Sequence, residues 1–157
     1  IFGAVPHSLR MVSKAGIMKI PVFGHAMVKA GFIAIDRKDR KKAIKQLDKA
    51  KDRLADGISI WIAPEGTRSR DGSIAPFKKG GFHIAKELKK PIVPVFIEGA
   101  AKVMPPDSIW VRPNQSITVH FLKPLSSEKV ESLSIVQLVE EVRQAIVAKK
   151  EECEKGE

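Results

Sequence analysis

The 157 residues fit one domain, which is predicted to span residues 1–157. Hydrophobic residues make up 43% of the chain and charged residues 29%, a composition that is typical of globular proteins and excludes disorder or a collagen-like chain. The one cysteine excludes a disulfide framework and a multi-cysteine zinc site, and the net charge of +10 favours an anionic partner.

The first part of the chain combines short strands with an apolar segment. Residues 9–13 have the pattern of a strand, and residues 16–35 form the most apolar region, with a short helix or irregular segment before a strand at 32–35. Gly24 and Gly31 interrupt any long helix there. Such a segment packs in the core or lies in a membrane interface, and the core is the preferred interpretation.

An amphipathic helix is predicted over 39–55, because apolar residues recur there at helical spacing while lysines and aspartates occupy the other face. Asp36 or Asp39 is the expected N-cap, and the Asp-Gly pair that follows the helix ends it. The next six residues, 58–63, have the composition of a buried strand, and residues 64–81 are predicted to form a loop.

The second half of the chain repeats this alternation, with a short helix at 82–88 and strands at 92–97 and 116–122. Ser134 caps a final helix with Gln137 as its capping-box partner, and the charged tail after Lys149 is expected to fray. The buried face of this helix is predicted to be Ile135, Leu138, Val139, Val142 and Ile146. The alternation predicts an α/β fold, a mostly parallel sheet flanked by helices.

The strongest candidate site is the loop that follows the strand at 58–63. Ligands of parallel α/β sheets bind beyond the carboxyl ends of the strands, which is where Glu65-Gly66-Thr67-Arg68 stands. Gly66 lets backbone N–H groups approach an anion, and Arg68 offers a planar fork for two phosphate oxygens, which Glu65 can orient. From composition alone, a polar loop with an exposed arginine is an equally good interpretation.

The other polar candidates are weaker. Asp36-Arg37 follows a strand, but a helix cap beside a surface charge explains the pair without a ligand. Solvated surface is the expectation for each of Lys14, Lys78 and Lys79. No histidine of the chain has a cysteine or a second histidine at metal-ligand spacing, so no metal site is predicted.

Five segments in a fixed order resemble one family. They are Ile-Pro-Val-Phe-Gly at 20–24, the segment 31–37 ending in Ile-Asp-Arg, Pro-Glu-Gly-Thr-Arg-Ser at 64–69, Pro-Phe-Lys-Lys-Gly at 76–80, and Ile-Val-Pro-Val at 92–95. Together they resemble the phospholipid/glycerol acyltransferases, and among these the 1-acylglycerol-3-phosphate (lysophosphatidate) acyltransferase group. The resemblance covers about residues 5–125. The ordered set is specific, whereas Glu-Gly-Thr-Arg alone is a weak signal.

The resemblance implies an O-acyltransferase of phospholipid biosynthesis with an α/β fold. Such an enzyme transfers a fatty acyl group from acyl-CoA or acyl-carrier protein to the free hydroxyl of 1-acylglycerol-3-phosphate, giving phosphatidate. The acyl donor is a co-substrate, and no resident cofactor is implied. An acyltransferase with glycerol-3-phosphate or a different lysolipid as acceptor is an alternative.

The resemblance also implies roles for particular residues. Arg68 holds the phosphate of the acceptor, and Lys14 lines the same pocket. The remaining residues implied in acceptor binding are Glu65, Gly66, Thr67, Asp36 and Arg37. Pro94 shapes the acyl-donor side.

The chain departs from the family in one motif. The family's catalytic pair is H-x-x-x-x-D, whose histidine is the general base for the acceptor hydroxyl. The residues five positions after the four histidines of this chain are Val12, Ala30, Leu88 and Leu125. We therefore expect a chain truncated at its N-terminus, with the His-Asp dyad upstream of Ile1, that binds the acceptor without efficient acyl transfer.

The expected partners are a lysophospholipid, an acyl donor and an anionic membrane surface. The expected location is the cytoplasmic face of a membrane, either peripheral or anchored by an N-terminal segment. A non-catalytic relative that binds anionic lipid is the second hypothesis. A nucleic-acid-binding domain is disfavoured, because aromatic residues reach only 6% and no nucleic-acid motif is present.

Overall fold

The computed structural model of the protein describes residues 3, 5, 8–14, 16, 20–35, 58–69, 71–105, 108 and 110–156. The chain divides into two compact units, Ile1–Ile62 and Ala63–Glu157, and each is described by itself. The helix predicted over 39–55 lies outside the described residues, as do its two candidate N-caps, Asp36 and Asp39. One domain over 1–157 stays a prediction.

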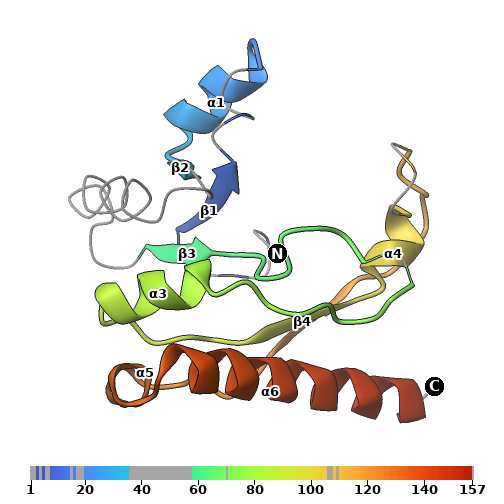
Figure 1. The fold of residues 1–157 in the computed structure, drawn as a ribbon. Coiled ribbons are helices and arrows are strands. Elements are labelled where there is room, and N and C mark those ends of the chain that lie inside the picture. Colours follow the sequence, from blue (N-terminus) through green and yellow to red (C-terminus); the bar gives the residue numbers. More distant parts are fainter. Residues whose placement is uncertain are drawn as a thin grey trace. The chain divides into compact units, whose positions relative to one another are not determined.

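The first unit is built on a three-stranded parallel sheet (Figure 1). Strand β1 (Leu9–Lys14) lies between β2 (Ile33–Ile35) and β3 (Ser59–Trp61). Its C-terminal half pairs with β2 and its N-terminal half with β3. The strands predicted at 9–13, 32–35 and 58–63 are confirmed, although β3 is shorter than predicted.

Helix α1 (Phe23–Lys29) divides its apolar residues between the inside and the outside of this unit. Met27 is buried, as are Leu9, Val12 and Ile33 of the sheet. In contrast, Val22, Phe23 and Val28 are 85%, 55% and 54% exposed. The prediction of a core segment is therefore right for Met27 and wrong for these three residues. Among the described residues, no helix combines the length and the apolar composition that crossing a membrane requires.

The described residues of the second unit form one strand pair and four helices. The strands are β4 (Val95–Glu98) and β5 (Thr118–Phe121), and the helices are α3 (Gly80–Glu87), α4 (Ala100–Val103), α5 (Ser127–Ser132) and α6 (Ile135–Gly156). The α/β class is confirmed, and the sheet of the first unit is parallel, in line with the predicted mostly parallel sheet, whereas β4 and β5 pair antiparallel. Within the described residues of the connection between the two strands, the one helix is the single turn α4, whereas a parallel crossover usually contains a full helix.

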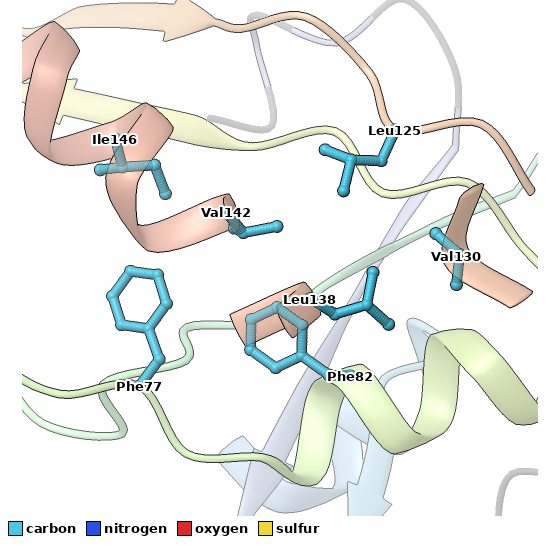
Figure 2. Close-up of a cluster of buried hydrophobic side chains, with 7 residues drawn as sticks. All are labelled: Phe77, Phe82, Leu125, Val130, Leu138, Val142 and Ile146. Carbon is cyan, nitrogen blue, oxygen red and sulfur yellow. The ribbon is translucent and has the colours of Figure 1, made fainter. Parts of the chain in front are cut away.

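The core of the second unit gathers side chains from its helices and from the segments before them (Figure 2). Leu138 of α6 and Val130 of α5 are fully buried at its centre. Around them lie Phe77, Phe82, Leu125, Val142 and Ile146. The two phenylalanine rings stack with their centroids 6.5 Å apart. The predicted stripe of α6 is confirmed, because its remaining members, Ile135 and Val139, pack against this cluster.

The N-terminal end of α6 matches the prediction, whereas its C-terminal end does not. The capping box is confirmed: the Gln137 N–H donates to Ser134 Oγ at 3.3 Å, and the Ser134 N–H donates to Gln137 Oε1 at 2.9 Å. The frayed tail is wrong, since α6 continues to Gly156. Lys149–Glu152 and Lys150–Glu154, each 2.7 Å apart, support the last turns as oppositely charged neighbours three and four residues apart.

Candidate acceptor-binding loop

The Glu-Gly-Thr-Arg segment begins in a tight turn. The Gly66 N–H donates to the Ala63 carbonyl at 3.2 Å, which places Pro64 and Glu65 at the two central positions of the turn. Proline at the first of these positions and glycine at the end are the preferred residues of the commonest turn. Gly66 has φ of +70°, a left-handed conformation that glycine adopts without strain. The sequence thus fixes the backbone of this segment locally.

Lys78 returns the chain to this turn. Its backbone N–H donates to the Pro64 carbonyl at 2.8 Å. A Cβ added to Gly66 would lie 2.8 Å from Lys78 Nζ, so the ammonium group stands directly over the glycine. The neighbouring Phe77 is buried in the core, which anchors the segment. Lys78 is exposed, as expected of a surface charge, and it also belongs to the same local structure as the turn.

Glu65 has a different partner from the one predicted. Its Oε2 accepts a hydrogen bond of 2.9 Å from the Ala75 N–H, which braces the segment leading to Lys78. The Arg68 side chain is exposed, and among the described residues none forms a hydrogen bond or ion pair with it. Thr67 is exposed as well. The loop thus presents a guanidinium whose donors face solvent, close in sequence to a turn with an ammonium group above it.

Asp71 organises the loop immediately after Arg68. Its Oδ1 accepts hydrogen bonds from the Ser73 hydroxyl at 2.6 Å, the Ser73 N–H at 2.9 Å and the Ser69 hydroxyl at 3.3 Å. These bonds, the two from Ser73 foremost, lower the pKa of the Asp71 carboxyl from 3.8 to about 2. The carboxylate is therefore ionised throughout the ordinary pH range and ties Ser69 and Ser73 to Asp71.

The other predicted acceptor-binding residues belong to the first unit. Lys14 is the last residue of β1, and its Cα partner is Ile35, the last residue of β2. Asp36 and Arg37 follow Ile35 and lie outside the described residues. The ends of two adjacent parallel strands therefore carry Lys14 and lead into the Asp-Arg pair, which is the position where ligands of such sheets bind.

Pro94, predicted on the acyl-donor side, is buried directly before β4. Its carbonyl accepts a hydrogen bond of 3.0 Å from the Leu122 N–H, which extends the β4–β5 pairing by one bond. The structure thus gives Pro94 a place in the framework of the second unit, and its role toward the donor stays a prediction.

A second polar cluster was not predicted from the sequence. His120 Nε2 lies 2.9 Å from Glu98 Oε2 and 3.7 Å from Cys153 Sγ. Burial, followed by the nearby Glu98 carboxylate, raises the pKa of the Cys153 thiol. The three residues are 22 and 33 positions apart along the chain, so short-range motif spacing carries no signal for them. Only the pairing of β4 with β5 and the length of α6 bring them together.

Comparison with known proteins places the chain among acyltransferases. The family model described as "Acyltransferase" matches residues 2–98. The chain is 36% identical over 126 residues to "1-acyl-sn-glycerol-3-phosphate acyltransferase BAT2, chloroplastic" of Brassica napus, a match that covers 80% of this chain and 37% of that protein. It is 32% identical to a 1-acyl-sn-glycerol-3-phosphate acyltransferase of Saccharomyces cerevisiae, covering 90% of this chain and 48% of that protein.

A solved structure supports the fold. The crystal structure of the 1-acyl-sn-glycerophosphate (LPA) acyltransferase PlsC of Thermotoga maritima matches with a TM-score of 0.68 at 24% identity. The match covers 92% of this chain and 56% of that one. The chain thus spans only 37% and 48% of the two curated relatives and about half of the solved one.

Proposed function

The chain belongs to the acyltransferase family, and from this premise we propose that it forms the acceptor-binding part of a lysophosphatidate O-acyltransferase. The reaction is transfer of a fatty acyl group from acyl-CoA or acyl-carrier protein to the free hydroxyl of 1-acylglycerol-3-phosphate, giving phosphatidate. The names of the relatives support this acceptor. The observation that carries the proposal is the turn at Gly66, with Lys78 Nζ above it and the exposed Arg68 two residues on.

This arrangement suits a phosphate monoester. Arg68 has five N–H donors in a planar fork, so it can hold two phosphate oxygens at once. Lys78 supplies a compact point charge, and its side chain occupies the space beside Gly66 where a Cβ would lie, so an anion that approaches this turn meets the ammonium group. Lys14, with Asp36, Arg37 and Thr67, completes the proposed acceptor set, and Pro94 is assigned to the donor side.

The experiment is a binding assay on the 157-residue chain. Titration with a short-chain lysophosphatidate, kept below its micellar concentration, is expected to give saturable binding by calorimetry. Arg68→Ala is expected to weaken binding about tenfold or more, because a hydrogen bond to a charged group is lost. The affinity of Arg68→Lys for lysophosphatidate is expected to lie between those of wild type and Arg68→Ala, since a point charge cannot replace a bidentate fork. Lys123→Ala, which removes another exposed lysine of the same unit, is the matched control.

The choice of acceptor is tested with two further ligands. A monoacylglycerol lacks the phosphate and is expected not to bind. Glycerol-3-phosphate keeps the phosphate but lacks the acyl chain, and binding as tight as that of lysophosphatidate would favour it as the acceptor. Equal affinities of wild type, Arg68→Ala and Lys123→Ala would contradict the assigned role of Arg68.

We also propose that the chain associates with anionic membranes. The net charge of +10 supports this, because a basic residue near an anionic surface contributes ~1 kcal/mol. The apolar side chains exposed at the N-cap of α1 and on the helix itself, Val22, Phe23 and Val28, offer a second contact. Binding to vesicles that contain anionic lipid is expected to weaken as salt shortens the Debye length from ~10 Å at 0.1 M to ~3 Å at 1 M. Equal binding to neutral vesicles at low salt would assign the association to the apolar residues of α1 instead.

A further inference from the structure

Three side chains with metal-binding atoms converge in the second unit. They come from three different elements: Glu98 ends β4, His120 lies in β5, and Cys153 lies in the last turns of α6. One ligand atom from each lies within 4.8 Å of the other two, and all three residues are partly buried. The cluster is separate from the Gly66 turn, and the proposed acyl transfer does not use it.

The strand register explains why two of these side chains share one face. Phe96 and His120 are directly opposite each other across the β4–β5 pair, and Glu98 stands two residues beyond Phe96 on the same side of β4. The Phe96 ring stacks on the His120 ring, with centroids 5.8 Å apart and an interplanar angle of 21°. Phe96 in turn packs against the hydrophobic core. The imidazole is therefore held in place before any ligand arrives.

Helix α6 brings the third side chain to this face. The helix packs against β4, and Figure 1 shows it running along the strand pair toward its C-terminal end. Leu138, Val142 and Ile146 bury the first part of α6 in the core. Cys153 follows Ile146 by seven residues, two helical turns, and so lies on the same side of the helix. The position of the sulfur is therefore set by the packing of the whole helix.

The contacts converge on a single nitrogen. Both Glu98 Oε2 and Cys153 Sγ approach His120 Nε2. A thiol–imidazole–carboxylate relay would use both ring nitrogens, one toward the sulfur and one toward the carboxylate. Three potential ligand atoms within 4.8 Å of one another suit a cation site instead.

The two distances to His120 Nε2 are near those of a tetrahedral ion. Zinc bonds of about 2.3 Å to sulfur and about 2.0 Å to nitrogen place those two ligand atoms roughly 3.5 Å apart. The observed separation of Sγ and Nε2 is 3.7 Å. The carboxylate oxygen, 2.9 Å from Nε2, has to withdraw by only a few tenths of an ångström to take up its own position.

The charges fit as well. A carboxylate and a thiolate carry two negative charges, which a divalent cation neutralises with neutral imidazole as the third ligand. Lys149, whose charge acts on the Cys153 thiol, is paired with Glu152 at 2.7 Å, so its charge is already balanced by a residue outside the cluster.

We propose that Glu98, His120 and Cys153 bind a divalent first-row transition metal ion of the zinc type, with water as the fourth ligand. The ion links the C-terminal turns of α6 to the β4–β5 pair. Its coordination thereby cross-links segments that are far apart in the sequence. Imidazole, thiolate and carboxylate are the ligand types that zinc takes in proteins. The hard cations Mg²⁺ and Ca²⁺ prefer sites made of oxygen atoms and are expected to be rejected.

Cobalt(II) is the probe that tests the sulfur ligand directly. The metal-free 157-residue chain is titrated with Co²⁺ and followed by absorption. The expected result is one ion per chain, with a thiolate-to-cobalt charge-transfer band and the intense visible bands of a tetrahedral complex. Because Cys153 is the only cysteine of the chain, the charge-transfer band reports this site alone. Zinc is expected to displace the cobalt, and Mg²⁺ is not.

Variants separate the site from adventitious binding. Cys153→Ser is expected to abolish the charge-transfer band, and Glu98→Gln and His120→Asn to weaken zinc binding by more than about tenfold, since even the loss of an outer-shell partner costs about that much. His25→Asn, at an exposed histidine of the other unit, is the matched control and is expected to bind like wild type. Circular dichroism of each metal-free variant checks that it is folded.

Two outcomes would overturn the proposal. The first is a wild-type chain that binds cobalt without a charge-transfer band, or not at all, a result that needs no variant to interpret. The second is zinc binding that survives Cys153→Ser but is lost in His25→Asn, which would place the ion elsewhere. The melting temperature with and without zinc is an independent readout. Zinc is expected to raise the melting temperatures of wild type and His25→Asn, and to have no effect on the melting temperature of Cys153→Ser.

Discussion

Gly99 and Gly72 form a matched pair that separates backbone strain from steric conflict. Both have a left-handed backbone, with φ of +79° and +80°. A Cβ at Gly72 would meet nothing within 4 Å, whereas a Cβ at Gly99 would overlap the backbone carbonyl oxygen of Ser116. Replacing each glycine by alanine therefore imposes the same conformational strain, and only Gly99→Ala adds a clash with fixed backbone.

The magnitudes follow from these two contributions. A left-handed alanine costs about 1 kcal/mol, so Gly72→Ala is expected to lower the free energy of unfolding by about that amount. Overfilling a packed site costs about 1–3 kcal/mol more, so Gly99→Ala is expected to lose about 2–4 kcal/mol in total. The clash matters because Gly99 follows β4 and Ser116 leads toward β5, so relieving it requires the two strands to separate.

Urea unfolding followed by far-ultraviolet circular dichroism measures both losses, because the 22 residues of α6 dominate the helical signal of this unit. Gly66→Ala tests a contact with a flexible side chain. Gly66 has φ of +70°, and an added Cβ would meet only the movable tip of Lys78. The loss of unfolding free energy is therefore expected to be close to that of Gly72→Ala. Equal losses for Gly99→Ala and Gly72→Ala would refute the reasoning, since they would show that the Ser116 carbonyl moves aside freely.

The remaining predictions concern the core, a helix cap and one carboxyl group. Leu138→Ala is expected to cost about 2–5 kcal/mol in urea unfolding, because Leu138 is fully buried, while Val136→Ala, at a residue 62% exposed on the same helix, is expected to stay within about 0.5 kcal/mol. Ser134→Ala is expected to cost about 1 kcal/mol in the same assay, and no loss would mean that the capping box contributes nothing. The pKa of Asp71, lowered from 3.8 to about 2, makes its contribution to the loop complete above about pH 4 and lost as the pH falls through about 2. In an NMR titration, Ser73→Ala is expected to return this pKa toward 3.8, and an unchanged value would contradict the assignment.

The sequence was sufficient where local chemistry decides the structure. The capping box at Ser134 and Gln137 depends on two side chains three residues apart, and the structure contains both of its hydrogen bonds. The buried stripe of α6 follows from helical spacing alone. The Gly66 turn is equally local, since proline and glycine at these positions specify it.

The sequence was insufficient where distant segments decide the structure. The antiparallel pairing of β4 with β5 depends on the path of residues 99–117, which alternation of helices and strands does not reveal. The charged tail of α6 has the composition of a frayed end, yet its ion pairs and the contact of Cys153 with His120 extend the helix to Gly156. The Glu98–His120–Cys153 cluster follows from both of these features, so sequence reasoning that missed them also missed the cluster.

Glu65 and Phe77 show how the core and the candidate site depend on each other. Phe77 is buried in the core, while the side chain of the next residue, Lys78, is exposed and lies over Gly66. The Glu65 carboxylate holds the same segment from the other end, through the Ala75 N–H. The residue expected to orient Arg68 instead fixes the backbone that carries Lys78. The segment that carries the ammonium group is therefore held by hydrophobic packing and by the hydrogen bonds of Ala75 and Lys78 to the turn, and no described residue forms a hydrogen bond or ion pair with the exposed Arg68.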